Sequence, residues 1–225
     1  MFFQLVHKLL DCKYHGRTMT PAELAAGLRQ VVGQPKIIKL RTKRSEIVDH
    51  DMVVVGGLYD PEQDREHEAC IDIHIIFHPD QQHITLDELT FKTLCFDVAE
   101  TVGHEMVHRS QHRRRRWKPI KRHVPTDPAD PARAEREYLG DPDELDAYGF
   151  TLAVELAFKH SCFQLDHALL NDLLMYKVYL KHFAQDQSVM LKLDNHISKY
   201  LCRLEVDFHE QNNTNTGRNK PRTGT

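Results

Sequence analysis

The chain has few cysteines for its length, and none of them are spaced as a pair that would bind a metal. Its five cysteines, Cys12, Cys70, Cys95, Cys162 and Cys202, lie far apart and form no CxxC motif. Disulfide-stabilised secreted domains and cysteine-based zinc modules need paired or clustered cysteines, so the sequence argues against both classes. We therefore expect reduced thiols and a cytoplasmic protein.

Long apolar runs and a strong net charge are also lacking. No stretch approaches the roughly 18 apolar residues of a membrane helix, and the apolar N-terminal segment is interrupted by His7 and Lys8, so we expect neither a membrane contact nor a signal peptide. The formal net charge of −3 over 225 residues does not suggest a polyanion binder. A hydrophobic content of 40% is enough for one core. We predict a single domain over residues 1–209 and a disordered polar tail over residues 210–225.

The order of the expected elements indicates an α+β fold. Thr20-Pro21 predicts a helix start and Gly33 its end, and three short segments rich in Val and Ile follow. These predicted strands are Lys36–Arg41, Met52–Leu58 and Cys70–His78. In the third, apolar residues alternate with polar ones, which is typical of a strand with one buried face. This strand is closest in sequence to the next helix, and we expect it to be an edge that pairs with an extended peptide.

The next helix carries the most informative motif of the chain. Thr85 and Glu88 predict a capping box at its start, and Leu94, Val98, Val102 and Met106 recur every four residues as an apolar stripe. Beyond Arg113 the predicted loop has no apolar periodicity. Helices are again expected over 142–158, 169–183 and 188–207, with a short helical turn near 132–137.

Within that helix, His104, Glu105 and His108 form an HExxH motif. A spacing of four residues stacks the two imidazoles on one helical face, where both can bind one divalent ion at about 2.0–2.1 Å. Glu105 is then positioned to act as a general base on a water molecule. The motif predicts metal-assisted hydrolysis.

A catalytic zinc site keeps three protein ligands, so a third must come from elsewhere. His112 lies eight residues after His104 on the same helix, where a further rigid turn runs away from the ion. His123 lies beyond the basic segment, at a spacing near that of SprT-type proteases. Glu144 lies at the start of a later helix and is the third candidate ligand. Alternatively, Asp141 and Glu144 form a capping box at the start of that helix.

The motif HEMVH followed by YLGDPDELDAY resembles the gluzincin class of zincins, and in particular small phage and bacterial metallopeptidases. The resemblance covers about residues 53–158. It implies a minimal zincin-like domain, with a sheet of three or more strands packed on the HExxH helix and a helical C-terminal part. It further implies that His104, His108 and Glu144 bind Zn²⁺, that Glu105 is catalytic, and that the substrate is a protein or peptide. A phage-encoded protein would act in the host cytoplasm.

The chain departs from thermolysin-like members of that class at one position. Those enzymes carry an aspartate four residues after the glutamate ligand, whereas Tyr148 stands here. Glu100 or Asp97 can instead orient a ligand histidine, or both belong to a solvated face. Tyr148 is expected in the core or as a donor to an oxyanion, and His74 and His78 as exposed histidines of a strand.

A basic run follows the motif. Seven of the ten residues from Arg113 to Arg122 are Arg or Lys, and Trp117 lies among them. Such a run suits weak nucleic-acid contact through Arg113, Arg114, Arg115 and Arg116, an acidic protein partner, or plain solvation. Two alternatives to a gluzincin peptidase therefore stay open: a non-catalytic zinc-binding module acting through residues 113–122, and a DNA-associated SprT-type protease.

Overall fold

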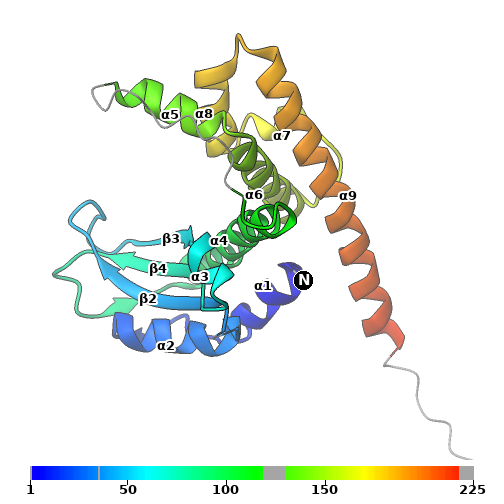
Figure 1. The fold of residues 1–225 in the computed structure, drawn as a ribbon. Coiled ribbons are helices and arrows are strands. Elements are labelled where there is room, and N and C mark those ends of the chain that lie inside the picture. Colours follow the sequence, from blue (N-terminus) through cyan, green and yellow to red (C-terminus); the bar gives the residue numbers. More distant parts are fainter. Residues whose placement is uncertain (1, 35, 119–129, 218–225) are drawn as a thin grey trace, which may run out of the picture. The chain divides into compact units, whose positions relative to one another are not determined.

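The computed structural model describes residues 2–34, 36–118 and 130–217, with side chains described up to residue 210. The chain divides into an N-terminal unit, Met1–Arg122, and a C-terminal unit, His123–Thr225. The α+β class is confirmed, with small sheets in the N-terminal unit and helices alone in the described part of the C-terminal unit (Figure 1). A single domain over residues 1–209 stays a prediction.

The N-terminal unit combines four helices and two sheets among its described residues. Its three-stranded sheet has the order β2-β4-β3, with β2 parallel and β3 antiparallel to β4. A two-stranded ribbon joins β1 to β5. The strands are β1 (Thr18–Met19), β2 (Ile38–Arg44), β3 (Val53–Tyr59), β4 (Ile71–Phe77) and β5 (Ile84–Thr85); the helices are α1 (Phe2–Leu10), α2 (Pro21–Val32), α3 (Pro61–Arg65) and α4 (Glu88–Arg114).

The alternation of strand β4 is confirmed. Ile71, Ile73 and Ile75 are fully buried, and α4 packs against the sheet formed by β3 and β4. The prediction that this strand is an edge is wrong, because β4 is bonded to β2 on one side and to β3 on the other. A strand with one fully apolar face and several half-buried residues on the other suits the centre of a small sheet. Among the described strands, β3 and β2 are the edges of this sheet.

Helix α4 begins slightly later than predicted. The Asp87 side chain caps it by accepting a hydrogen bond of 2.7 Å from the Thr90 N–H. Thr85 is not the cap, because it lies in β5 opposite Thr18, and the two hydroxyl oxygens are 2.7 Å apart. Thr85 therefore pairs within a strand and does not form the capping box that the sequence predicted. The helix ends at Arg114, so Arg113 and Arg114 are helical and not part of a loop.

Helix α2 has the predicted ends. Thr20 and Glu23 form a complete capping box, and Gly33 closes the helix with a φ of +54°. This left-handed conformation favours glycine, because a side chain there is strained.

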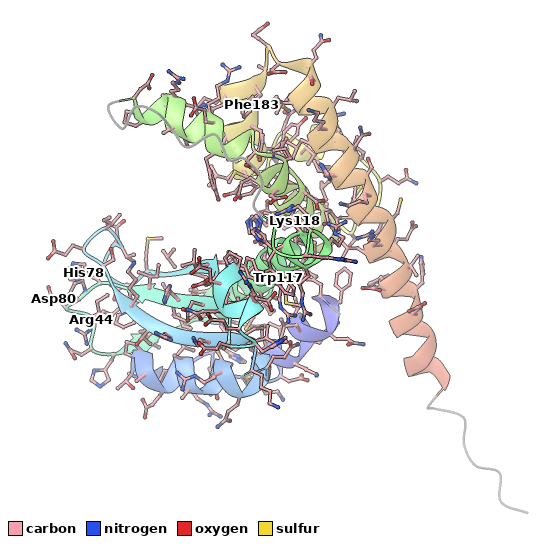
Figure 2. All side chains as sticks on the ribbon, in the orientation of Figure 1. Arg44, His78, Asp80, Trp117, Lys118 and Phe183 are labelled. Carbon is pink, nitrogen blue, oxygen red and sulfur yellow. The ribbon has the colours of Figure 1, made fainter. Side chains whose placement is uncertain are left out.

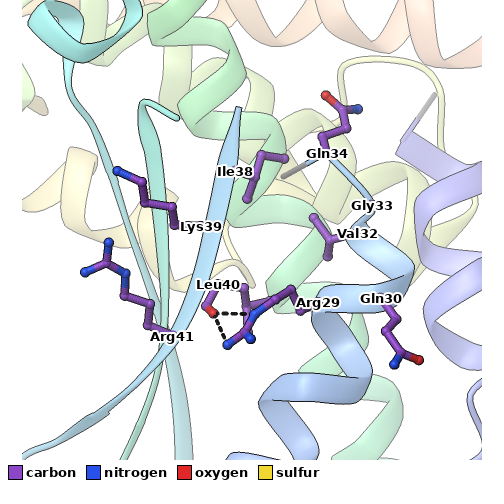
Figure 3. Close-up of a pocket in the computed structure, with 9 residues that line it drawn as sticks. All are labelled: Arg29, Gln30, Val32, Gly33, Gln34, Ile38, Lys39, Leu40 and Arg41. Atoms are coloured by element: carbon purple, nitrogen blue, oxygen red, sulfur yellow. Dashed lines mark hydrogen bonds between the residues drawn. The ribbon is translucent and has the colours of Figure 1, made fainter. Parts of the chain in front are cut away.

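The edge of strand β2 is partly covered from α2. Arg29 donates two hydrogen bonds, of 3.1 and 2.9 Å, to the Leu40 carbonyl oxygen (Figure 3). Beside this contact lies a hollow of about 500 Å³ between the end of α2 and β2. The cations at the hollow are engaged elsewhere, since Lys39 bonds to a glutamine at 3.0 Å and Arg41 pairs with Asp72 at 3.4 Å. Arg29 thus occupies one main-chain acceptor on this edge of the sheet.

The described part of the C-terminal unit is helical. Its helices are α5 (Pro131–Leu139), α6 (Pro142–His160), α7 (His167–Leu170), α8 (Leu174–Phe183) and α9 (Gln187–Gly217). Helices α6 and α9 pack side by side (Figure 1). The single helix predicted over 169–183 is divided into α7 and α8. A tight turn separates them, in which the Leu173 N–H donates a hydrogen bond of 2.9 Å to the Leu170 carbonyl.

Helix α9 is longer than the sequence indicated. Residues 211–217 were predicted to be disordered, but their backbone is helical. Adding a residue to a helix that has already formed is far easier than starting one, which explains the extension. The remainder of the predicted tail, 218–225, lies outside the described residues. All five cysteines are free thiols. No helix in the described part of the chain has the length and apolarity needed to cross a membrane.

The buried face of β4 gives a direct test of the fold. Ile73 is 0% exposed, so Ile73→Ala should lower the free energy of unfolding by about 2–5 kcal/mol through lost burial and a cavity. Leu58 on the neighbouring strand is 61% exposed, and Leu58→Ala should change stability by at most about 0.5 kcal/mol. Urea denaturation of both variants measures the difference. Equal losses would contradict this assignment of faces.

Candidate metal centre

The HExxH motif lies in the second half of α4, where buried polar residues join the apolar stripe. Leu94, Val98 and Val102 are buried, as predicted for the stripe, whereas Met106 is only half-buried. Glu105 and His108 are also buried, at 7% and 8% exposure, and His104 is half-buried. Burial of ionisable side chains is costly, so a cluster of them on one helix needs a structural or chemical reason.

The two motif histidines are arranged as ligands of one ion. Their Nε2 atoms are 3.2 Å apart, and their ring centroids are 4.9 Å apart. Two nitrogens bound to Zn²⁺ in tetrahedral geometry are separated by about 3.3 Å. The donor atoms of His104 and His108 therefore have the separation and chemistry that this metal requires.

A residue that the sequence did not single out orients one of these rings. The Gln111 Oε1 atom lies 3.0 Å from His108 Nδ1, and Gln111 is buried. Because an amide oxygen only accepts, the His108 Nδ1 must carry the proton, which leaves the Nε2 lone pair available for a metal. The position of Gln111, one turn after His108, was the available signal. Glu100 and Asp97 are half-buried, and an orienting role for either stays a prediction.

Glu105 lies directly against strand β3. A Cβ atom built at Gly57 would be 2.7 Å from Glu105 Oε1 and 2.5 Å from Thr101 Cγ2. Only glycine permits this approach of strand and helix. Gly57 is itself exposed, so the buried Glu105 carboxylate adjoins an accessible part of an edge strand. The Gly56-Gly57 pair within a strand was the signal in the sequence.

Glu144 lies in the first turn of α6, in the C-terminal unit. The Asp141 side chain caps this helix by accepting a bond of 2.8 Å from the Asp143 N–H. Glu144 is buried at 6% exposure, and the helix N-terminus favours its ionised form. Burial, followed by the charges of Tyr148 and Glu144, raises the pKa of the Tyr138 hydroxyl above its usual range. Tyr138 thus becomes a further polar neighbour of Glu144 that sequence reasoning missed.

Tyr148 belongs to an aromatic cluster in the same unit. Its ring centroid lies 6.4 Å from that of Tyr138 and 5.9 Å from that of Tyr179. Burial, followed by Tyr148 and Glu144, raises the pKa of the Tyr179 hydroxyl above its usual range. Tyr148 is half-buried in this packing, and its role as a donor to an oxyanion stays a prediction.

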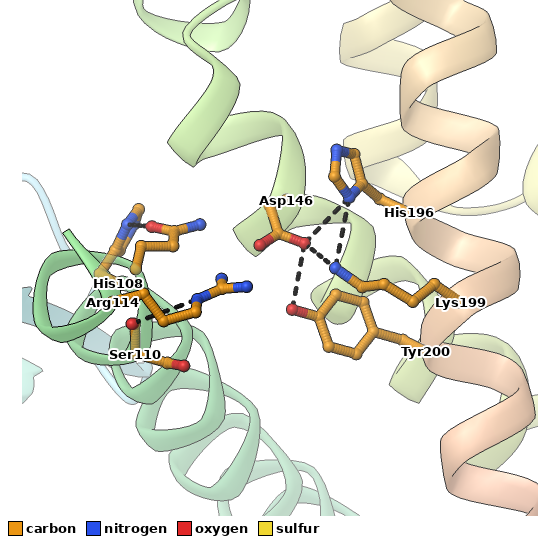
Figure 4. Close-up of polar contacts among 8 residues, drawn as sticks. His108, Ser110, Arg114, Asp146, His196, Lys199 and Tyr200 are labelled. Atoms are coloured by element: carbon orange, nitrogen blue, oxygen red, sulfur yellow. Dashed lines mark hydrogen bonds and ion pairs between the residues drawn. The ribbon is translucent and has the colours of Figure 1, made fainter. Parts of the chain in front are cut away.

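A second carboxylate of α6 ties this helix to α9. Asp146 is buried, accepts a hydrogen bond of 3.1 Å from the Tyr200 hydroxyl, lies 2.9 Å from His196 Nδ1 and forms an ion pair with Lys199 (Figure 4). The helices also approach closely at Gly149, where a Cβ atom would lie 2.4 Å from His196 Cβ. The first turn of α6, which carries Glu144, is therefore held by contacts two to five residues further along.

Another buried carboxylate, Asp64 in the N-terminal unit, holds the end of α4. Asp64 lies 3.0 Å from Arg109 Nε and 3.6 Å from Arg113 Nε, and it accepts a hydrogen bond of 3.2 Å from the Tyr59 hydroxyl. His112, a candidate third ligand, packs on the same tyrosine with ring centroids 5.3 Å apart. His123, the other histidine candidate, lies outside the described residues.

Part of the basic run is less available for binding a partner than its sequence suggests. Arg113 pairs with Asp64, and its guanidinium lies 6.0 Å from the ring centroid of Trp117. Trp117 is half-buried at the end of α4, next to the exposed Lys118 (Figure 2). Part of the positive charge thus serves the fold. Lys121 and Arg122 lie outside the described residues.

Comparisons with known proteins add no independent assignment. No family model, curated protein or solved structure matches this chain.

The Asp146 contacts predict a stability effect in the C-terminal unit. Asp146→Ala leaves His196 and Lys199 without this acceptor, and it should lower the free energy of unfolding by about 1–3 kcal/mol. Glu205→Ala, an exposed acidic position on α9, is the matched control and should be nearly neutral. Urea denaturation followed by circular dichroism compares them. A neutral Asp146→Ala would contradict an anchoring role.

Proposed function

We propose that the chain is a zinc-dependent peptidase of gluzincin type, in which His104, His108 and Glu144 bind the metal and Glu105 is the general base. The 3.2 Å separation of the two histidine Nε2 atoms, on the helix that also carries the buried Glu105, is the observation that carries this proposal. The buried Gln111, which sets the tautomer of His108, supports it further. Glu144 is supported by its burial at a helix N-terminus and by the resemblance of its motif.

The chemistry follows from the placement of Glu105. A bound Zn²⁺ would polarise the scissile carbonyl and make an attacking water more acidic. Glu105 takes a proton from that water and delivers it to the leaving amine nitrogen. Its burial beside Gly57 keeps the carboxylate out of bulk water, which strengthens its electrostatic interactions with a substrate.

The edge position of β3 supports a peptide as the substrate. Among the described strands this one pairs only with β4, and its Gly57 adjoins Glu105. An extended peptide added to that edge would form main-chain hydrogen bonds close to the general base. Strand β3 therefore takes the role that the sequence had suggested for β4.

Two alternatives differ from this proposal in a measurable way. A non-catalytic zinc-binding module would hold the metal without turnover, and a SprT-type protease would use His123 in place of Glu144. Weak nucleic-acid contact through Arg113 to Arg116 stays a prediction, and the Asp64 contact of Arg113 weakens it.

The ligand set predicts a ranking of zinc affinities. His104→Ala and His108→Ala should each lose the zinc that binds at the HExxH motif. Glu144→Ala should weaken binding at that motif far more than His123→Ala, because His104, His108 and Glu144 are its three proposed protein ligands. His112→Ala, which alters the same helix, should keep the zinc. Competition titration with a chelator ranks the variants. A larger loss in His123→Ala than in Glu144→Ala would favour the SprT-type site.

The base assignment predicts a separation of binding from turnover. Glu105→Gln should keep zinc and the fold but lower hydrolysis of a denatured-protein substrate by at least about 10²-fold, because the amide cannot accept the proton of water. Glu88→Gln, an exposed change at the start of the same helix, should leave activity unchanged. If the wild type binds zinc yet cleaves nothing across a broad peptide library, the non-catalytic module is the better description.

A further inference from the structure

A second group of metal-binding side chains lies within the N-terminal unit, away from the HExxH motif. His50 belongs to the connection between β2 and β3, and His78 and Asp80 follow β4. One potential ligand atom from each lies within 4.8 Å of those of the other two. Figure 2 shows His78 and Asp80 at the end of the sheet, near Arg44.

We propose that His50, His78 and Asp80 form a second site, which binds a divalent transition metal such as Zn²⁺. The ring centroids of the two histidines are 3.7 Å apart, and the Asp80 Oδ2 atom is 3.8 Å from His78 Nδ1. Two imidazole nitrogens and one carboxylate oxygen are a ligand set that suits zinc, cobalt, nickel and copper better than calcium or magnesium.

The His78 ring already turns an unprotonated nitrogen toward Asp80. Its Nδ1 atom accepts a long hydrogen bond of 3.2 Å from the Asp80 N–H, so the lone pair of Nδ1 points to that side. A metal at Nδ1 would replace this one bond. Because Asp80 is exposed, its N–H can then bond to water, and the loss is small.

Both connections that supply the ligands are anchored close by. Val48 is buried two residues before His50, and Gln81 is buried next to Asp80. The two connections are also joined to each other, because the Ser45 N–H donates to the Phe77 carbonyl at 3.0 Å and Arg44 donates to the Pro79 carbonyl. Ligands on connections that are already fixed lose less conformational entropy when a metal binds.

The surrounding charge favours a cation. Glu46, Asp49 and Asp51 are exposed acidic residues in the connection that carries His50, and they outnumber the two basic residues, Lys43 and Arg44, that end β2. The metal would link the connection after β2 to the connection after β4. We infer a structural clamp at this end of the sheet, which is independent of the proposed peptidase function.

The test uses the untagged full chain with His104→Ala and His108→Ala, titrated with zinc chloride by isothermal calorimetry. This background should still bind one Zn²⁺ per chain, and adding His50→Ala or His78→Ala should weaken that binding at least about tenfold. Asp80→Asn should weaken it less than either histidine change, because the amide retains an oxygen donor. His83→Ala removes an exposed histidine from the same connection as a matched control and should leave the affinity unchanged.

Two results would overturn the second site. One is the absence of zinc binding in the His104→Ala, His108→Ala background while circular dichroism shows that its fold is kept. The other is an equal loss of affinity in His50→Ala and in the His83→Ala control. Failure of the peptidase proposal would leave the expected result intact, since the titration measures binding with the HExxH ligands removed.

Discussion

The close contact between α4 and β3 determines the surroundings of the buried Glu105 carboxylate. Gly57 allows the helix to approach the strand so closely that a single added carbon would meet the Glu105 carboxylate. That approach places the buried Glu105 against the strand, and the four-residue spacing within α4 separately brings the Nε2 atoms of His104 and His108 to 3.2 Å. The placement of Glu105 depends on Gly57, a residue with no side chain at the edge of the sheet whose central strand, β4, provides the buried apolar face.

Buried carboxylates hold the elements that carry the proposed ligands. Asp64 binds Arg109 one residue after His108, and Asp146 binds partners on α9 two residues after Glu144. Removing a carboxylate from water costs several kcal/mol unless cations and hydroxyl donors replace the lost hydration. Each of these two aspartates has both a tyrosine hydroxyl and a cation as partners. Such directional contacts fix the orientation of a helix better than apolar packing does, and this suits helices that carry proposed metal ligands.

Much of the fold was predictable because its signals are local. The α+β order, the three strands, the capping box of α2 and the two-residue period of β4 each depend on neighbouring residues. The central position of β4 and the pairing of Thr85 with Thr18 depend on residues distant in the sequence. The predictions of an edge position for β4 and of a capping role for Thr85 were therefore wrong. In the candidate site, the helical spacing predicted the proximity of His104 and His108. The sequence carried signals for Gln111 and Gly57 as well, but their roles became clear only from their contacts with His108 and Glu105.

The two groups of metal-binding side chains differ in the chemistry that their surroundings permit. His108 and Glu105 are buried, so a general base there acts where water is largely excluded and electrostatic interactions are strong. His50 and Asp80 are exposed, and the acidic residues beside them face solvent. A metal held there would be screened by water and would have no enclosed carboxylate to receive a proton. With a metal bound, the same ligand types would therefore suit hydrolysis at the HExxH motif but only a structural link at the end of the sheet.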